Sequence, residues 1–264
     1  MAKLSRYDSK TPDAKGFIHY SAEENRIWAE LISQQIPMLE GKVCSEFIQA
    51  LDVMNFPLDR IPQLHEVSQI LQKTTGWSVE PVPSLIDFPS FFELLANRKF
   101  PAATFIRRRA DMNYLQEPDI FHEIFGHTPL LTDSRFAAFT EAYGKVGLAA
   151  EKNDHAMLAK LYWFTVEFGL IQAEQGVCPY GAGIVSSPGE LSYALESDIP
   201  QRLPFDPIEV LRTPYRIDIY QTVYFIIDSF DILVELGNKD LISYIREARQ
   251  LGMHQPTYTV KDIA

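Results

Sequence analysis

The sequence lacks several features that would assign it to a common class of protein. Its 264 residues include only two cysteines, Cys44 and Cys178, which are too few for a disulfide framework and do not form a CxxC pair. We therefore expect two buried, reduced thiols. No run of about 18 apolar residues occurs, and no apolar segment follows the N-terminus as it does in a signal peptide. The expected location is the cytoplasm.

An excess of basic residues is also missing. The chain has 24 basic and 35 acidic residues, which gives a net charge of -11. Phosphate backbones and anionic lipids are bound by basic surfaces, so we expect neither nucleic acid nor a membrane as a partner. The sequence contains no internal repeat, low-complexity tract or flexible linker. A single compact unit that binds a small molecule fits these absences best.

Hydrophobic spacing and turn residues predict the organisation of the chain. Residues 1–20 are polar and are interrupted by Pro12 and Gly16, which indicates a flexible N-terminal arm before one domain at 21–264. Ser21 and Glu24 form a capping box that predicts a helix to about residue 35. Further elements are expected as helices at 37–54, 61–72, 89–97 and 155–174, a strand at 100–106 and a loop at 77–84. From residue 119 onward helices should dominate, apart from an irregular glycine-rich segment at 178–183. The predicted fold class is mainly α, with a few short β-strands.

The segment from Glu117 to Pro129 contains two histidines that could bind a metal. His122 and His127 are five residues apart, so a regular α-helix would separate their directions by about 140 degrees. Gly126 and Pro129 favour a helix end at this point, from which His127 could turn back toward His122. Two histidines near a helix end can also be merely packed or solvated, so a further ligand is needed.

Glu167 is the candidate for that ligand. On the expected helix, its neighbours three and four residues away are all apolar: Trp163, Phe164, Leu170 and Ile171. A carboxylate on such a face must be protonated, paired with a group such as an arginine, or bound to a cation. Two imidazoles and one carboxylate leave coordination positions open, as in Fe(II) oxygenases and in catalytic zinc sites. The residue types alone leave both metals possible.

Several motifs occur in the order found in one family. They are Ile61-Pro-Gln-Leu64, Thr74-Thr-Gly-Trp77, Glu117-Pro-Asp-Ile-Phe-His-Glu-Ile-Phe-Gly-His127, Trp163-Phe-Thr-Val-Glu-Phe-Gly169 and Tyr180-Gly-Ala-Gly-Ile-Val-Ser-Ser187. Through them the chain resembles the pterin-dependent aromatic amino acid hydroxylases over roughly residues 17–235. It looks most like the short, single-domain bacterial members, which hydroxylate phenylalanine to tyrosine. The resemblance implies a mainly helical catalytic domain that uses Fe(II), a tetrahydropterin such as tetrahydrobiopterin, and dioxygen.

The resemblance also implies roles for individual residues. His122, His127 and Glu167 would bind the iron, and Glu123 would contact the pterin through water and take part in catalysis. The remaining pterin contacts would be Val82, Ser84 and Leu85 in one loop and Phe91 as the stacking ring. Arg107 would bind the substrate carboxylate, a role that suits the guanidinium fork, with Asp119 supporting it. Pro118, Trp163, Phe168 and Ser186 would contact the substrate; Ser186 would also orient His122, and Tyr162 would lie near the iron.

Some family properties should not transfer, and other functions stay open. Longer members have a regulatory domain and an oligomerisation helix that do not fit in this chain, so we expect a monomer or homodimer. Leu115 stands where many relatives have threonine, which leaves tyrosine or tryptophan as alternative substrates. A zinc-dependent hydrolase is a less favoured alternative, because one extra residue separates the histidines compared with HExxH. A helical module with structural zinc would normally have four ligands, including cysteine.

Overall fold

A computed structural model of the chain describes residues 6–83, 85–112, 115 and 117–258. Its α-helices are α1 (Ala22–Leu39), α2 (Ser45–Met54), α3 (Leu64–Thr74), α4 (Phe88–Ala96), α5 (Ser134–Ala149), α6 (Lys152–Tyr162), α7 (Ala182–Val185), α8 (Pro188–Glu196), α9 (Pro207–Arg212), α10 (Phe230–Gly237) and α11 (Leu241–Leu251). Short 3-10 turns form η1 (Arg109–Asp111) and η3 (Leu130–Thr132). Two further segments, η2 (Phe121–His127) and η4 (Trp163–Glu167), are π-helical. The mainly α prediction is confirmed.

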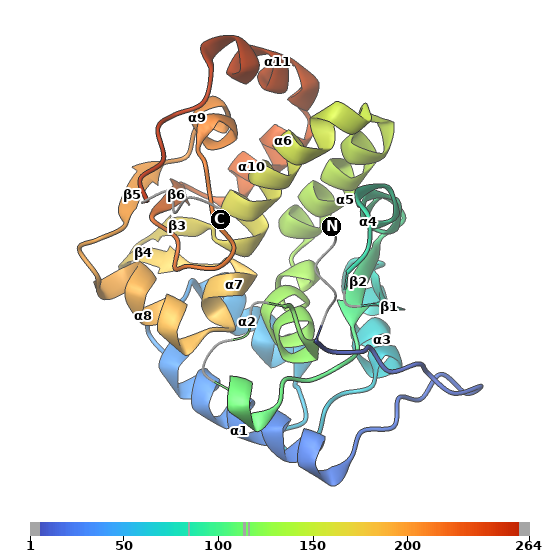
Figure 1. Cartoon of the computed structure of the whole chain (residues 1–264). Helices are drawn as coiled ribbons and strands as arrows, with labels where there is room; N and C mark the ends of the chain where they lie inside the picture. Colours follow the sequence, from blue (N-terminus) through green and yellow to red (C-terminus); the bar gives the residue numbers. More distant parts are fainter. Residues whose placement is uncertain (1–5, 84, 113–114, 116, 259–264) are drawn as a thin grey trace.

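Two small sheets lie on different sides of the helices (Figure 1). The first pairs β1 (Ser78–Val82) with β2 (Lys99–Ala103) in parallel. The second has the order β4-β3-β6-β5 and comprises β3 (Leu170–Ala173), β4 (Gly176–Pro179), β5 (Gln201–Pro204) and β6 (Val223–Ile227). In it β6 runs parallel to β3 and β5, whereas β4 is antiparallel to β3. Both sheets add residues to the same core as the helices, among them Phe100 of β2 and Phe225 of β6.

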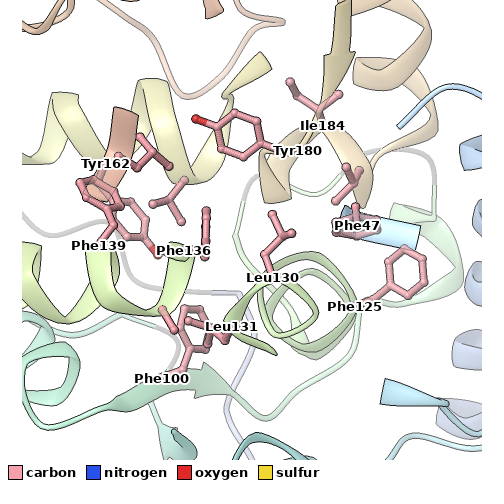
Figure 2. Close-up of a cluster of buried hydrophobic side chains, with 14 of the residues drawn as sticks. Phe47, Phe100, Phe125, Leu130, Leu131, Phe136, Phe139, Tyr162, Tyr180 and Ile184 are labelled. Atoms are coloured by element: carbon pink, nitrogen blue, oxygen red, sulfur yellow. The ribbon is translucent and has the colours of Figure 1, made fainter. Parts of the chain in front are cut away.

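Large apolar side chains fill the space between the helices. Figure 2 shows part of this core: Phe136 of α5 lies near Tyr180, which follows β4, and Phe125 of η2 lies farther along the same cluster. The close approach of α5 to α4 depends on glycine, because a Cβ at Gly144 would lie 2.4 Å from the Ala96 nitrogen. Both thiols are free and buried, as expected. None of the helices in the described part of the chain has the length and apolar character needed to cross a membrane.

Several predicted boundaries are wrong. The capping box at Ser21 is present, but α1 continues through Pro37 to Leu39, and the next helix begins at Ser45 rather than 37. Pro37 removes only the one hydrogen bond that its own nitrogen would donate, while Leu39 extends the buried stripe. The predicted loop at 77–84 contains β1. Its prolines are tolerated because both strands of a two-stranded sheet are edges.

The second half of the chain contains more sheet than predicted. The helix expected at 155–174 is α6 and η4, which begin at Lys152 and end at Glu167, and Leu170–Ala173 is β3. The glycine-rich segment at 178–183 is likewise divided between β4 and α7. Short apolar runs fit either a buried strand or a buried helix, so periodicity could not separate the two.

Residues 6–20 contain no helix or strand, yet two of their side chains are buried. Tyr7 and Ile18 are 6% and 3% exposed. The main chain of Ile18 exchanges hydrogen bonds with the Gln63 side chain, and Thr104 bonds Ser9 and Lys10. The arm therefore lies against the domain along most of its described length. Its flexibility stays a prediction.

Candidate metal centre and adjoining cleft

A π-helical turn brings the two histidines together. The Nε2 atoms of His122 and His127 lie 3.1 Å apart. The sequence predicted that the helix would end at Gly126, but η2 continues through His127. In a π-helix each N–H bonds five residues back, so residues five apart share a face. Gly126 has another function: a Cβ there would lie 3.1 Å from the Ala182 carbonyl oxygen, which lets α7 pack closely.

Glu167 reaches the same point from the last residue of η4. Its Oε1 is 3.0 Å from His127 Nε2, and its Oε2 is 3.5 Å from His122 Nε2. Gly181 and Gly183 lie against this turn; a Cβ on Gly181 would be 2.5 Å from the Glu167 carbonyl oxygen. The glycine-rich segment is therefore needed for close packing behind the carboxylate. Three donor atoms from two distant helices face one another.

Ser186 sets the ring orientation and tautomer of His122. Its Oγ lies 3.0 Å from His122 Nδ1 and donates its own proton to the Ala182 carbonyl, 2.7 Å away. The serine oxygen must therefore accept the proton of His122 Nδ1, since its hydrogen is already used. That arrangement leaves Nε2 with a free lone pair directed at His127 and Glu167. A lone pair held in this way suits a metal ligand.

The charges of the cluster favour a cation at this point. Burial alone would raise the pKa of Glu167, but His127 and His122 outweigh it and hold that pKa well below its usual range. For His122 burial is outweighed by the Glu167 contact, which raises the pKa, whereas for His127 burial prevails and lowers it. The carboxylate is ionised and stabilised by positive charge. Two imidazole nitrogens with one carboxylate fit a divalent transition metal such as Fe(II) or Zn(II).

A second carboxyl group, that of Glu123, competes for the role of third ligand. One of its oxygens and the ligand nitrogens of both histidines all lie within 4.8 Å of one another. Burial raises the pKa of Glu123 to about 8, with His122 opposing and Glu167 adding to the shift. A carboxyl group that stays protonated is a poor ligand. Glu167, which is ionised and contacts both rings, is therefore the better candidate for the third position.

A cleft of about 190 Å³ opens beside His122 and Glu167. Five residues that the sequence suggested for the substrate line it: Arg107, Pro118, Trp163, Phe168 and Ser186. The Trp163 ring lies between Phe168 and Tyr215, with centroid distances of 4.6 Å to both. The cleft thus has an aromatic wall next to the candidate metal centre and a guanidinium in its lining.

Asp119 holds that guanidinium and also contacts the metal side. Its two oxygens accept from Nε and Nη2 of Arg107 at 2.8 Å each, and Oδ2 also accepts from the Arg107 backbone nitrogen at 2.9 Å. Oδ1 accepts in addition from the His122 backbone nitrogen at 3.1 Å. Both side chains of the ion pair are buried. One carboxylate therefore links the arginine to the start of the histidine-bearing turn.

The residues suggested for the pterin lie outside this cleft. Phe91 on α4 packs edge-on against Tyr162 at 5.2 Å, and Tyr162 lies 6.2 Å from the His127 ring. Phe91 thus contacts a ring that lies next to one of the candidate metal ligands. Val82 is in β1 and Leu85 is 59% exposed, and neither lines the cleft. Ser84 lies outside the described residues.

Sequence reasoning missed one wall of the cleft. Glu190 and the segment 217–221 also line it. Gln221 accepts from Trp163 Nε1 at 2.9 Å, and Glu190 Oε1 accepts from the Gln221 backbone nitrogen at 3.0 Å and from the Tyr224 hydroxyl at 2.5 Å. Burial raises the pKa of Glu190 to about 7, against these hydrogen bonds. No local motif marks these residues, since they reach the cleft only through tertiary packing.

Comparisons with known proteins agree on one family. A profile described as biopterin-dependent aromatic amino acid hydroxylase matches residues 3–259. A phenylalanine-4-hydroxylase of Pseudomonas aeruginosa is 49% identical over 99% of this chain and 100% of its own length. The apo structure of a cold-active phenylalanine hydroxylase from Colwellia psychrerythraea matches with a TM-score of 0.93 and 52% identity, covering 95% of this chain and 97% of that one. A phenylalanine hydroxylase from Chromobacterium violaceum, solved with bound oxidised Fe(III), matches with a TM-score of 0.88 and 40% identity over 96% and 94% of the two chains.

Proposed function

This chain belongs to the biopterin-dependent aromatic amino acid hydroxylases, and on that premise we propose that it is a phenylalanine 4-monooxygenase. It hydroxylates L-phenylalanine to L-tyrosine with dioxygen, a tetrahydropterin and a mononuclear non-haem Fe(II). The observation that carries the proposal is the meeting of His122, His127 and Glu167, with contacts of 3.0 to 3.5 Å between donor atoms, at the end of an aromatic cleft that contains an arginine.

In this proposal the three side chains hold Fe(II) through His122 Nε2, His127 Nε2 and a Glu167 oxygen. Iron and the reduced pterin supply the electrons and the site for activating dioxygen. Two imidazoles and a carboxylate are the ligand set found in oxygen-activating ferrous enzymes. Ser186 keeps His122 in the tautomer that can coordinate, and Glu167 supplies the negative charge that a ferrous ion requires.

The amino acid occupies the cleft. Nη1 of Arg107 has only a 3.5 Å contact with the Met112 carbonyl, so it remains able to donate to a substrate carboxylate. Pro118, Trp163 and Phe168 surround the aromatic ring and exclude water from it. The protein thus contributes mainly orientation, which by itself accounts for a large part of the acceleration in reactions of this kind.

The pterin lies on the side of Phe91 and Tyr162. Phe91 is only partly buried, so part of its ring is accessible for stacking, and one Glu123 oxygen lies within 4.8 Å of the ligand nitrogens of both histidines. A protonated Glu123 can donate a hydrogen bond as well as accept one. Val82, Ser84 and Leu85 would complete the site.

Two alternatives use the same centre. Tyrosine or tryptophan hydroxylation requires only a different fit in the cleft, and Leu115 lines that cleft where many relatives have threonine. A zinc hydrolase is opposed by the π-helical spacing of five between the histidines, in place of the four residues of HExxH on an α-helix. We also propose a cytoplasmic monomer or homodimer, and the two free, buried thiols fit a reducing compartment.

The test is a set of parallel assays on purified protein. Metal-free enzyme should form no tyrosine from phenylalanine and should regain activity with Fe(II) but not Zn(II), when reduced pterin and oxygen are supplied. Tyrosine and tryptophan should be poorer substrates under the same conditions. Faster turnover of either would reassign the substrate, and activity with zinc alone would overturn the oxygenase proposal. Sedimentation of the same sample measures its oligomeric state.

A further inference from the structure

Tyr7 in the N-terminal arm contacts the segment that carries Arg107. Its ring stacks on Phe105 with centroids 4.7 Å apart and planes 15° apart. Its hydroxyl donates to the carboxylate of Asp111 and accepts from the backbone nitrogen of Arg108 at 3.2 Å. The Arg108 guanidinium also lies over the Tyr7 ring, 5.1 Å from its centroid. Tyr7 therefore touches the chain on both sides of Arg107.

These contacts form a small core of their own. Tyr7, Ala103 and Phe105 make a buried cluster separate from the main one, and Leu115 packs against it. Leu115 and Arg107 both line the cleft. One ring from the arm thus supports two parts of the cleft wall. In Figure 1 the dark blue arm passes next to the green segment that follows β2. The contacts of Tyr7 join these two parts of the chain.

The supported segment has little regular structure of its own, and its other side-chain anchor is Arg109, which pairs with Glu23 and Glu30 of α1. Between Arg107 and Glu117 its only regular element among the described residues is the three-residue turn η1. The Asp119 carboxylate secures Arg107 from the interior, whereas the arm secures the outer side. There the Arg6 backbone nitrogen also donates to Glu117 Oε1 at 3.2 Å, and Glu117 lines the cleft as well. A segment this short, with few regular hydrogen bonds, depends on such contacts for its conformation.

We propose that Tyr7 is a positioning residue for the amino-acid site: its hydroxyl and ring hold the 105–111 segment, and its ring supports Leu115, so that Arg107 and Leu115 face the substrate. Tyr7 does not touch the substrate. The inference rests on the proposed function, because it assigns the substrate carboxylate to Arg107. It extends that function by making the arm part of the amino-acid site rather than a dispensable leader.

The test compares Tyr7→Phe with Tyr20→Phe in the full-length, iron-loaded enzyme. Tyr7→Phe keeps the stacked ring and removes only the hydroxyl. Tyr20 is a matched control, because its hydroxyl also ties the arm to the domain, but it donates to the carbonyl of Thr104, at 3.0 Å, which precedes the 105–111 segment. The KM for phenylalanine, the KM for the pterin, kcat and the melting temperature are measured for each.

Tyr7→Phe should raise the KM for phenylalanine about tenfold, as expected for losing a hydrogen bond to a charged group, and leave the KM for the pterin and the iron content unchanged. Tyr20→Phe should leave the KM for phenylalanine at the wild-type value. An equal rise in both variants, or a lower melting temperature of Tyr7→Phe without a change in that KM, would mean a purely structural role and overturn the proposal. A wild-type enzyme that forms no tyrosine would instead refute the proposed function.

A double-mutant cycle tests the route through Asp111. If Tyr7 acts by holding Asp111, then Tyr7→Phe combined with Asp111→Asn should raise the KM no further than the more severe single variant. Effects that multiply would show that the two side chains act independently and would overturn the proposed route.

Discussion

The two sides of the catalytic region are built differently. The candidate metal ligands come from π-helical turns whose neighbours, including Phe121, Phe125 and Phe164, belong to the main core and are no more than 1% exposed. The amino-acid side is an irregular segment held by the Arg107–Asp119 ion pair and a separate cluster of three buried residues. The metal side is thus positioned by packing, and the amino-acid side by a few polar contacts. Changes on the first side should affect metal content and kcat, and changes on the second should affect KM.

The largest effect is expected at Glu167. Glu167→Gln removes the charge that balances the cation and should lower both iron content and activity by more than about 100-fold. This loss is larger than the one expected for a residue that hydrogen-bonds a metal ligand without binding the metal itself. Glu123→Gln is the matched variant and should retain iron. Metal analysis and tyrosine formation measure the two outcomes. If Glu123→Gln lost iron and Glu167→Gln retained it, Glu123 rather than Glu167 would be the third metal ligand.

A smaller loss on the metal side should follow from Ser186→Ala. Without the hydroxyl, the Nδ1 proton of His122 has no acceptor there, so the ring is less firmly held in its coordinating tautomer. Iron affinity or kcat should fall about 10- to 100-fold. The neighbouring Ser187→Ala removes the N-cap of α8 instead, so it should lower the melting temperature with little change in iron affinity. Equal iron affinities in Ser186→Ala and wild type would exclude the orienting role.

On the amino-acid side, Arg107→Lys should raise the KM for phenylalanine about 10- to 100-fold while iron content stays unchanged. Lysine retains the charge but cannot bond Asp119 in bidentate fashion and still donate into the cleft. Arg109→Lys is the control, because that guanidinium pairs with Glu23 and Glu30 at the surface of α1. If the KM stayed constant in Arg107→Lys, the substrate carboxylate would have to bind elsewhere.

The smallest effect concerns stability and pH at Glu190. In the folded protein the pKa of Glu190 is about 7, above its ordinary value of 4.5. As the pH rises, the unfolded chain therefore loses this proton at a lower pH than the folded protein does. The protonated side chain therefore favours the folded state below pH 4.5, and that contribution is lost between about pH 4.5 and 7. Glu190→Gln can still accept both hydrogen bonds and does not ionise. As the pH rises through this window, the free energy of unfolding of Glu190→Gln should increase by about 1–3 kcal/mol relative to that of wild type.

Urea unfolding of wild type and Glu190→Gln at pH 5, 6, 7 and 8 measures this gain. Comparing the two proteins at each pH cancels the titration of all other groups. Glu196→Gln, on the same helix and 60% exposed, is the surface control. A difference between wild type and Glu190→Gln that does not vary with pH would contradict the prediction and would place the ionisation of Glu190 outside this range.

Local signals in the sequence predicted some elements well. The capping box at Ser21 has the same physical basis in any fold, and it begins α1 as expected. Residue chemistry also sufficed to select His122, His127 and Glu167 as candidates. The local path was predicted wrongly: we expected His127 to turn back from a helix end at Gly126, because 3.6 residues per turn would separate the two histidines, whereas a π-helical turn places residues five apart on one face. The turn also packs closely against α7 at Gly126, and α7 is distant in the sequence.

The wall formed by Glu190 and Gln221 had no signal at all. Gln221 belongs to the cleft only because it bonds Trp163, 58 residues earlier in the chain. Single-residue chemistry carries no information about such a pair. The strands β1 and β3 were missed for a related reason: each is only five or four residues long and becomes a strand through its partner.

By itself, the sequence determined the kinds of donor available, the acidic charge balance, the mainly helical composition and, through its motifs, the family. These properties depend on residue types and short-range spacing, which every chain carries before it folds. Only the tertiary structure decided that two imidazoles and a carboxylate meet, which carboxyl group stays ionised, and how the arm supports the amino-acid side. Those outcomes depend on the distances between residues that are far apart in the chain and on how deeply each side chain is buried. Both quantities are set only when the core packs.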